Sequence, residues 1–195
     1  THAYDICAVG TDVTGVEQLA KALPASKITA LIISNCGMGP DAVSIVASTL
    51  AKAGLERVDI SENPIGGEGG TALVDAIPSS SLKTIKIGTS FEVTINECSG
   101  AALDCSNQKL GPGQLVVLSW WLSTEATAGV AVIDILQNVT DDEGLKAVIG
   151  CFEANPQIQS VCGVAAGSVQ ADFSKRGLKP IDIKIIAHEL NSTRS

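Results

Sequence analysis

The sequence predicts an α/β solenoid, a linear array of strand–turn–helix units in which each unit packs mainly against its neighbours. Apolar residues recur 27 positions apart, and a fixed spacing of this kind is typical of repeat proteins rather than of one globular core. Within each period, a short alternating stretch precedes apolar residues at helical spacing. The clearest series are Tyr4, Leu31, Val58 and Ile85, and Ile6, Ile33, Ile60 and Ile87.

One complete unit extends from Ile28 to Gly54. Alternation up to Ile33 predicts a short strand. Pro40 and Asp41 predict the start of a helix, because proline suits the first helical turn and an acidic residue there interacts favourably with the helix dipole. The glycine at the end of the unit predicts the end of that helix.

Extended along the chain, this pattern predicts eight strands and six helices. Strands are expected near residues 3–7, 29–34, 56–61, 83–88, 102–106, 131–136, 159–163 and 170–174. Helices are expected near residues 13–23, 40–53, 67–78, 112–127, 141–154 and 180–190. The strands should form one parallel sheet that lines the concave side, above a continuous column of buried residues. That column comprises Ile6, Ile33, Ile60, Ile87, Cys105, Ile135 and Phe173.

The second half of the chain is less regular. Residues 103–122 and 171–190 resemble each other at an offset of 68 residues. Only 18 residues separate Ile87 from Cys105, and only 10 separate Gly163 from Phe173, so neither interval can hold a returning helix of normal length. Alternation within residues 91–98 predicts a small β-excursion. We therefore expect one domain over residues 1–195, with regular units in 1–88, an irregular connection in 89–101 and further units in 102–195.

Several units resemble the leucine-rich repeat family, whose pattern LxxLxLxxN/C is carried by Leu55, Val58, Ile60 and Asn63. The unit length and the helix-forming segment after Asn63 resemble the ribonuclease-inhibitor-like subclass. Ran GTPase-activating protein and the repeat domains of NOD-like receptors belong to that subclass. The resemblance implies a horseshoe arc with a concave sheet and convex helices. It also implies that one ladder of side chains bonds to backbone groups in the turns, namely Cys36, Asn63, Gln108 and Asn138.

Composition narrows the classes of partner and compartment. The chain has 195 residues and a formal net charge of −8, which argues against nucleic acid or an anionic membrane as partner and leaves simple solubility or a basic protein partner as explanations. No apolar stretch approaches the roughly 18 residues of a membrane span. The six cysteines form no CxxC pair, so we expect free thiols in a reducing compartment, either the cytoplasm or an organelle after removal of a transit peptide.

The sequence offers little for catalysis, and no enzyme, cofactor or metal site is predicted. Only His2 and His188 could act as bases near neutral pH, and the repeat register places no cysteine or aspartate to form a triad with either. The glycine-rich segments 64–70 and 110–113 lack the following Lys-Ser/Thr of a phosphate-binding loop, so we interpret them as strand-to-helix turns.

Two surfaces are candidates for binding a protein. One is a row of strand side chains opposite the apolar column. This row comprises Asp5, Ile32, Asp59, Lys86, Asp104, Asp134, Cys162 and Asp172. Its aspartates, chiefly Asp59, Asp104 and Asp134, predict a negative stripe interrupted by Lys86 and Arg57, with side chains in solvent; the alternative is a solvated position without function.

The other candidate surface is the helix that carries Trp120 and Trp121. Adjacent helical residues point roughly 100° apart, so one indole should enter the core and the other should remain available to a partner.

These observations favour a non-catalytic interaction scaffold or accessory subunit. The alternatives are a regulator of a small GTPase, an inhibitor or sensor domain, and an enzyme that uses cysteine chemistry. The chain begins almost within a repeat strand and ends soon after a helix, with no polar cap evident at either end. We therefore expect it to belong to a longer chain or a larger assembly.

Overall fold

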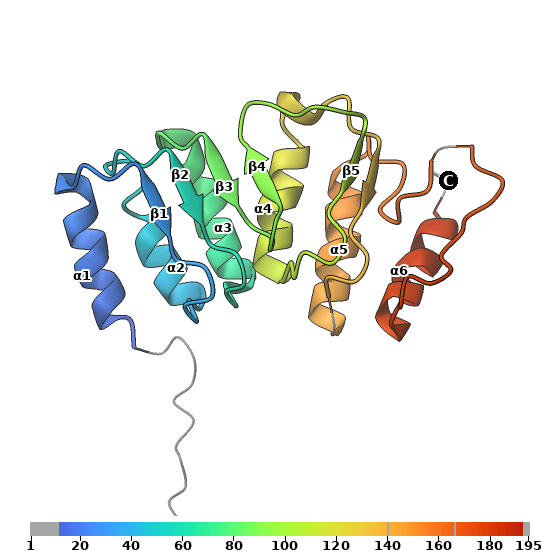
Figure 1. Ribbon diagram of the computed structural model, residues 1–195, viewed down its shortest axis with the longest axis horizontal. Helices are drawn as coiled ribbons and strands as arrows, with labels where there is room; N and C mark the ends of the chain where they lie inside the picture. The colour runs from blue at the N-terminus through green and yellow to red at the C-terminus, as the bar shows by residue number, and fades with distance from the viewer. Residues whose placement is uncertain (1–11, 140, 166, 193–195) are drawn as a thin grey trace, which may run out of the picture.

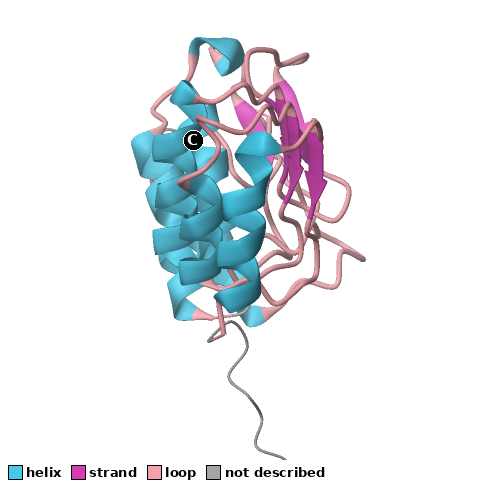
Figure 2. Ribbon diagram, turned by 90° about the vertical axis from the view of Figure 1, so that its left-hand side faces the viewer, coloured by secondary structure: helices cyan, strands magenta, loops and turns pink. Residues whose placement is uncertain are grey.

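The computed structural model describes residues 12–139, 141–165 and 167–192. Successive strand–helix units lie side by side from α1 at one end to α6 at the other (Figure 1). Helices form one layer and strands form the other (Figure 2). The expected strand at residues 3–7, with Ile6 of the buried column, lies outside the described residues.

All six expected helices are present in the described part of the chain. They are α1 Thr14–Ala22, α2 Pro40–Ala47, α3 Gly66–Ala76, α4 Pro112–Leu122, α5 Asp142–Ala154 and α6 Pro180–Leu190. Short 3₁₀ turns, η1 Leu23–Ala25, η2 Ile77–Ser79 and η3 Glu125–Thr127, follow α1, α3 and α4. Helix α2 ends earlier than expected, where the Ser48 and Thr49 hydroxyls donate to the carbonyls of Ile45 and Val46.

Six strands occur among the described residues, rather than the eight expected. They are β1 Ala30–Ile32, β2 Arg57–Asp59, β3 Thr84–Lys86, β4 Glu92–Thr94, β5 Ala102–Asp104 and β6 Val132–Asp134. In the first three, Leu31 pairs with Val58 and Val58 pairs with Ile85, in parallel. This register confirms that the 27-residue spacing places equivalent residues side by side.

The expectation of one parallel sheet is wrong, because the strands form two sheets. The first has the order β1-β2-β3-β4, and the second contains β5 and β6. Strand β4 lies in the excursion predicted at residues 91–98 and pairs antiparallel with β3, so that Ile85 opposes Val93. Because β4 occupies the free edge of β3, β5 cannot continue the first sheet.

The last two expected strands are not formed. Residues 159–163 make only isolated bridges, through Ser160 and Cys162, and residues 170–174 contain no strand. At residues 159–163, the Glu189 carboxylate of α6 accepts hydrogen bonds from the backbone N–H groups of Val161 and Cys162. A buried N–H needs one acceptor, and here a helix side chain supplies it in place of a neighbouring strand.

The predicted apolar column is buried in its middle and less buried at its two described ends. Its central members, Ile60, Ile87, Cys105 and Ile135, are buried. Ile33 and Phe173 are only partly buried, because Ile33 lies in the first described strand unit and Phe173 lies in the loop before α6.

Glycines allow neighbouring helices to approach closely. A Cβ atom at Gly69 would lie 3.3 Å from Pro40 Cα of the preceding helix, and one at Gly70 would overlap the backbone of Gly113 in the following helix. Helix α3 therefore has one small position facing α2 and another facing α4. The glycine-rich segment 64–70 thus serves helix packing, in agreement with its interpretation as a turn and helix start.

Candidate functional site

The row of strand side chains opposite the apolar column, which we call the concave row, differs from the predicted negative stripe. Its described aspartates are already hydrogen-bonded within the protein. Asp59 is only 4% exposed, so the expectation that this side chain points into solvent is wrong. Its Oδ1 accepts hydrogen bonds from the Ser61 amide at 3.0 Å and the Ser61 hydroxyl at 2.6 Å. Its other oxygen lies 3.3 Å from Lys86 Nζ.

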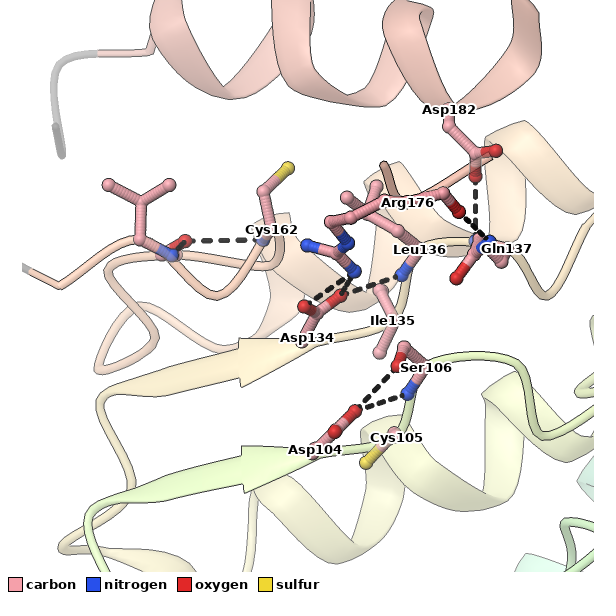
Figure 3. Close-up of polar contacts among 12 residues, drawn as sticks. Asp104, Cys105, Ser106, Asp134, Ile135, Leu136, Gln137, Cys162, Arg176 and Asp182 are labelled. Carbon is pink, nitrogen blue, oxygen red and sulfur yellow. Dashed lines mark hydrogen bonds and ion pairs between the residues drawn. The ribbon is translucent and has the colours of Figure 1, made fainter. Parts of the chain in front are cut away.

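The same arrangement recurs at the ends of later strands (Figure 3). Asp104 is exposed and accepts hydrogen bonds from the Ser106 amide at 2.9 Å and hydroxyl at 2.7 Å. Asp134 is half-buried, accepts a hydrogen bond from the Leu136 amide and lies 2.7 Å from an Arg176 guanidinium nitrogen. Each carboxylate binds the amide two residues later, which caps the turn that follows the strand.

These contacts also change the acidity of the carboxyl groups. Burial alone would raise the pKa of Asp59, but the hydrogen bonds from Ser61 and the ammonium of Lys86 outweigh it and lower that pKa. Hydrogen bonds from the Ser106 hydroxyl and amide lower the pKa of Asp104. Both groups are therefore held in the charged form.

Basic side chains offset much of the negative charge of the row. Arg57, which was expected to interrupt the stripe, forms an ion pair of 2.8 Å with Glu92 of β4, and this contact lowers the pKa of Glu92. Together with the pairs Lys86–Asp59 and Arg176–Asp134, it gives a row of mixed charge. Among the remaining positions, Ile32 is exposed and Cys162 is buried, while Asp5 lies outside the described residues.

The two tryptophans separate as the helical geometry predicts. Trp121 is 3% exposed, donates its indole N–H to the Thr94 carbonyl at 2.9 Å and packs edge-on against Phe91. Trp120 is only partly buried. The expectation that one indole enters the core while the other reaches the surface is confirmed.

Trp120 lines a groove that the sequence analysis missed. We call it the Trp120 groove; its volume is about 420 Å³. Its apolar residues are Ile77, Pro78, Leu82, Ile95, Trp120 and Ala126. A second depression, of about 460 Å³, shares Asn96 and Ala126 with it and continues along the excursion. Sequence could not reveal the groove, because its walls come from η2, the segment after β4, and η3.

The charged residues that line these two depressions are both acidic. Glu125 lines the Trp120 groove and Glu97 lines its continuation, and the described lining contains no lysine or arginine. The two depressions are therefore lined by apolar and polar residues together, and the charged residues among their described lining are acidic.

The candidates for catalytic chemistry are not brought together. His188 Nε2 lies 3.9 Å from Glu153 Oε1, and the His188 ring packs edge-on against Phe152, while His2 lies outside the described residues. In the part of the chain that the structure describes, no three His, Cys, Asp or Glu side chains form a cluster that could hold a metal ion. A search of the same residues finds no helix long and apolar enough to cross a membrane.

The five described cysteines are unbridged, and Cys7 lies outside the described residues. Burial raises the pKa of the Cys151 thiol to about 11 and shifts those of Cys105 and Cys162 still further upward. Reaction as a nucleophile requires the thiolate, so these buried thiols are poorly suited to it.

A comparison with protein families finds a leucine-rich repeat in one region of the chain. Residues 55–74 match a family model described as Leucine Rich repeat. This segment contains β2, the turn with Asn63 and most of α3. Asn63 forms the expected ladder contacts, because its Oδ1 accepts from the amides of Cys36 and Met38.

No curated protein matches the chain. A solved structure of the tropomodulin C-terminal domain from Caenorhabditis elegans is similar over 92% of this chain and 92% of that chain. The sequence identity is 13% and the TM-score is 0.38.

Proposed function

We propose that this chain is a non-catalytic protein-binding scaffold or accessory subunit, built as a ribonuclease-inhibitor-like leucine-rich-repeat array. The observation that carries the proposal is the partly exposed Trp120, which lines a groove together with other apolar residues and the acidic Glu125. Tryptophan is among the residues that most often dominate the binding energy of protein interfaces.

The groove is well suited to binding because its walls are anchored. Trp121, the neighbour of Trp120, is fixed in the core by its hydrogen bond to Thr94 and by Phe91. Thr127 of η3 is buried and donates its hydroxyl to the Trp121 carbonyl at 2.9 Å. A partner would therefore meet a preorganised surface, which reduces the entropy lost on binding.

The chemistry of the groove indicates the kind of segment that it would accept. The accessible apolar side chains of the groove, Pro78 and Trp120, favour an aliphatic, aromatic or proline side chain of the partner. Glu97 and Glu125 favour a lysine or arginine beside it. The preferred partner is thus an extended segment of mixed apolar and basic character, in agreement with the net charge of −8.

The concave row is the second candidate surface. The residues proposed for contact are Asp59, Lys86, Asp104 and Asp134 of this row and the neighbouring Arg57, and the exposed Asp104 favours contact with a basic group. Because three ion pairs already offset charge along this row, electrostatic steering by it should be weaker than a row of free aspartates would give.

Affinity purification with the chain as bait, followed by binding kinetics with each purified partner, tests the proposal. We expect Trp120→Ala and Glu125→Lys to increase the dissociation rate at least tenfold, while Asp104→Asn has little effect. Loss of binding in Asp104→Asn with unchanged binding in Trp120→Ala would place the site on the concave row instead. A nucleotide-hydrolysis assay with added small GTPases tests the regulator alternative, and retention of a ribonuclease or another enzyme in an inhibited form tests the inhibitor alternative.

A further inference from the structure

Strand β5 has one paired edge and one unpaired edge, although it lies in the middle of the array (Figure 1). It pairs with β6 on one side, while β4, on the other side, belongs to the first sheet. The Ala101 carbonyl and the Cys105 amide are both bonded to β6. Because backbone groups of successive strand residues point in opposite directions, those of Ala102 and Asp104 point away from β6.

Strand β4 does not cover this edge, because a tryptophan occupies the matching edge of β4. Val93 pairs with Ile85 of β3, so the backbone groups of Glu92 and Thr94 point away from β3. The Thr94 carbonyl accepts a hydrogen bond from the indole N–H of Trp121 at 2.9 Å. A buried side chain of α4 thus takes the place of an amide of β5. This contact explains why two consecutive strands do not form a hairpin.

The exposure of β5 agrees with an edge that is open. The central residue of a strand in this array points into the core, and in the other five described strands it is at most 8% exposed. In β5 the central residue, Leu103, is only partly buried, and both Ala102 and Asp104 are exposed. Among the described strands, only β5 has this pattern, as expected for a strand that lacks a neighbour on one side.

We infer that the unpaired edge of β5 binds an extended segment of a partner protein, which adds to β5 as a further strand. We call this surface the β5 edge; it consists of the outward backbone groups of Ala102 and Asp104 and the side chain of Leu103. Addition of a strand to an open sheet edge is a recurrent mode of peptide recognition, in which main-chain hydrogen bonds supply the affinity. The β5 edge does not include Trp120, so this inference goes beyond the proposed function.

Side chains around the β5 edge indicate the chemistry of the segment. Directly opposed residues of neighbouring strands point to the same face, so the residue beside Leu103 faces the core and should be apolar. The residue beside Asp104 faces the concave side. Asp104 is exposed, and Glu92 on β4 is also exposed and acidic, although it is paired with Arg57. Lysine or arginine is therefore favoured there, which gives a segment of alternating apolar and basic residues.

The contact is short. Beyond β5 the two chain segments meet, because Gln108 accepts hydrogen bonds from the amides of Thr89 and Ser90. Strand β4 stands on the other side of the edge, so a single extended segment suits the site better than the edge of another folded sheet. With only a few residues paired, we expect weak binding, with a dissociation constant of about 10 µM to 1 mM.

Amide hydrogen exchange measured by NMR on the full chain tests the inference. In the free protein, the amides of Ala102 and Asp104 should exchange quickly and those of Leu103 and Cys105 slowly, because only the latter are bonded to β6. The probe is a blocked heptapeptide of alternating lysine and valine. At saturating concentration it should slow exchange at Ala102 and Asp104 at least tenfold.

Two control peptides separate backbone pairing from simple attraction. The same heptapeptide with every backbone amide N-methylated keeps its side chains but has no N–H donors, so it should not protect either amide. A heptapeptide with glutamate in place of lysine keeps its donors but meets acidic neighbours, so it should bind at least tenfold more weakly. Both controls use the original chain and therefore do not depend on the folding of any variant.

Proline substitution tests the edge from the side of the protein. Ala102→Pro removes an N–H that points away from β6 and should weaken binding of the lysine–valine peptide at least tenfold. The matched control is Ala30→Pro, since Ala30 is also the exposed first residue of its strand and its N–H points away from β2. Slow exchange at Cys105 verifies that pairing with β6 persists. Trp120→Ala should leave peptide binding unchanged, which separates this site from the Trp120 groove.

Several results would overturn the inference. One is unchanged exchange at Ala102 and Asp104 with saturating peptide, and another is equal protection by the N-methylated peptide. Slow exchange of both amides and of Glu92 in the free protein would show that β4 itself closes on β5. Protection that grows with protein concentration in the absence of peptide would show that a second copy of the chain occupies the edge instead.

Discussion

The Glu189 carboxylate accepts a hydrogen bond from the backbone N–H of Val161 at 2.6 Å. The same oxygen accepts from the Cys162 amide at 3.1 Å, and the other oxygen accepts from the Ser160 hydroxyl at 2.8 Å. These groups lie within residues 159–163, where a strand was expected and only isolated bridges form. One buried side chain on α6 thus satisfies polar groups that would otherwise need a strand beside them.

Replacement of Glu189 by alanine should therefore destabilise the protein by about 2–4 kcal/mol, because buried amides are left without an acceptor. Urea unfolding followed by circular dichroism measures this loss. Glu153→Ala is the control: Glu153 is an exposed acidic residue on α5, and its replacement should change the free energy of unfolding by less than about 0.5 kcal/mol. Similar losses in both variants would show that the bonds to Val161 and Cys162 are not important for stability.

Asn63→Ala should be destabilising by about 2–4 kcal/mol. The Asn63 amide joins two units, since its Oδ1 accepts from the Cys36 and Met38 amides and its Nδ2 donates to the Ile33 carbonyl at 2.7 Å. Several buried backbone groups lose their partner together, and each costs about 1 kcal/mol or more. The exposed Asn96 provides the control, and an equally large loss in Asn96→Ala would contradict this explanation.

The adjacent tryptophans should behave differently in solution. In a Trp120→Phe variant, the remaining indole of Trp121 is buried, so its fluorescence should be blue-shifted and resistant to acrylamide quenching. In Trp121→Phe, the remaining Trp120 should be red-shifted and readily quenched. Trp121→Ala should destabilise by about 3–5 kcal/mol, as is usual for loss of a large buried aromatic side chain. Equal quenching of the two single-tryptophan variants would contradict the assignment of Trp120 to the surface.

Thiol reactivity should follow burial. Cys36 is exposed and should react first with a thiol reagent in the folded protein, while Cys105, Cys151 and Cys162 should react only after unfolding. Burial raises the pKa of Cys151 to about 11, so raising the pH from 7 to 9 should not make it reactive while the fold persists. Under denaturing, non-reducing conditions we expect six free thiols, and a count of four or fewer would contradict the expectation of a reducing compartment.

Acid should destabilise the protein through the carboxylates at the strand ends. The pKa values of Asp59, Asp104 and Glu92 are lowered in the folded state, so their contributions are present above the unfolded pKa values, near 4, and are lost as the pH falls through the folded values. Stability should thus fall below about pH 4. Asp59→Asn should show a shallower fall, and a slope identical to that of the original chain would exclude a contribution from Asp59.

Local sequence patterns predicted most of the helices and strands, but not how all of the strands pair. The 27-residue spacing of Leu31, Val58 and Ile85 was sufficient to predict both β1–β3 and their register. Alternation near Phe91 predicted strand β4, but its antiparallel pairing depends on how the chain folds back onto β3. No strand forms at residues 159–163, where the Glu189 carboxylate from α6 accepts hydrogen bonds from the Val161 and Cys162 amides.

The candidate sites, too, depend on contacts that the sequence did not predict. Register placed Asp59, Asp104 and Asp134 in one row, but it did not predict their contacts with Ser61, Ser106 and Arg176. A serine two residues after Asp59 and Asp104 was the sequence signal that these carboxylates cap turns. No comparable signal exists for the Trp120 groove, whose walls are far apart in the chain and meet only in three dimensions.

The two sheets are separated between β4 and β5, and we expect the array to bend there. On the helical side, the backbones of Gly70 and Gly113 are in close contact and leave no room to compress. On the strand side, Gln108 bridges the interruption by accepting hydrogen bonds from the amides of Thr89 and Ser90. If the array bends there, we expect the strand layer to open at the Gln108 hydrogen bonds, while α3 and α4 remain in contact through Gly70 and Gly113. We expect the curvature of the array to change more readily at this joint than within either sheet, because β4 and β5 belong to different sheets and share no strand pairing.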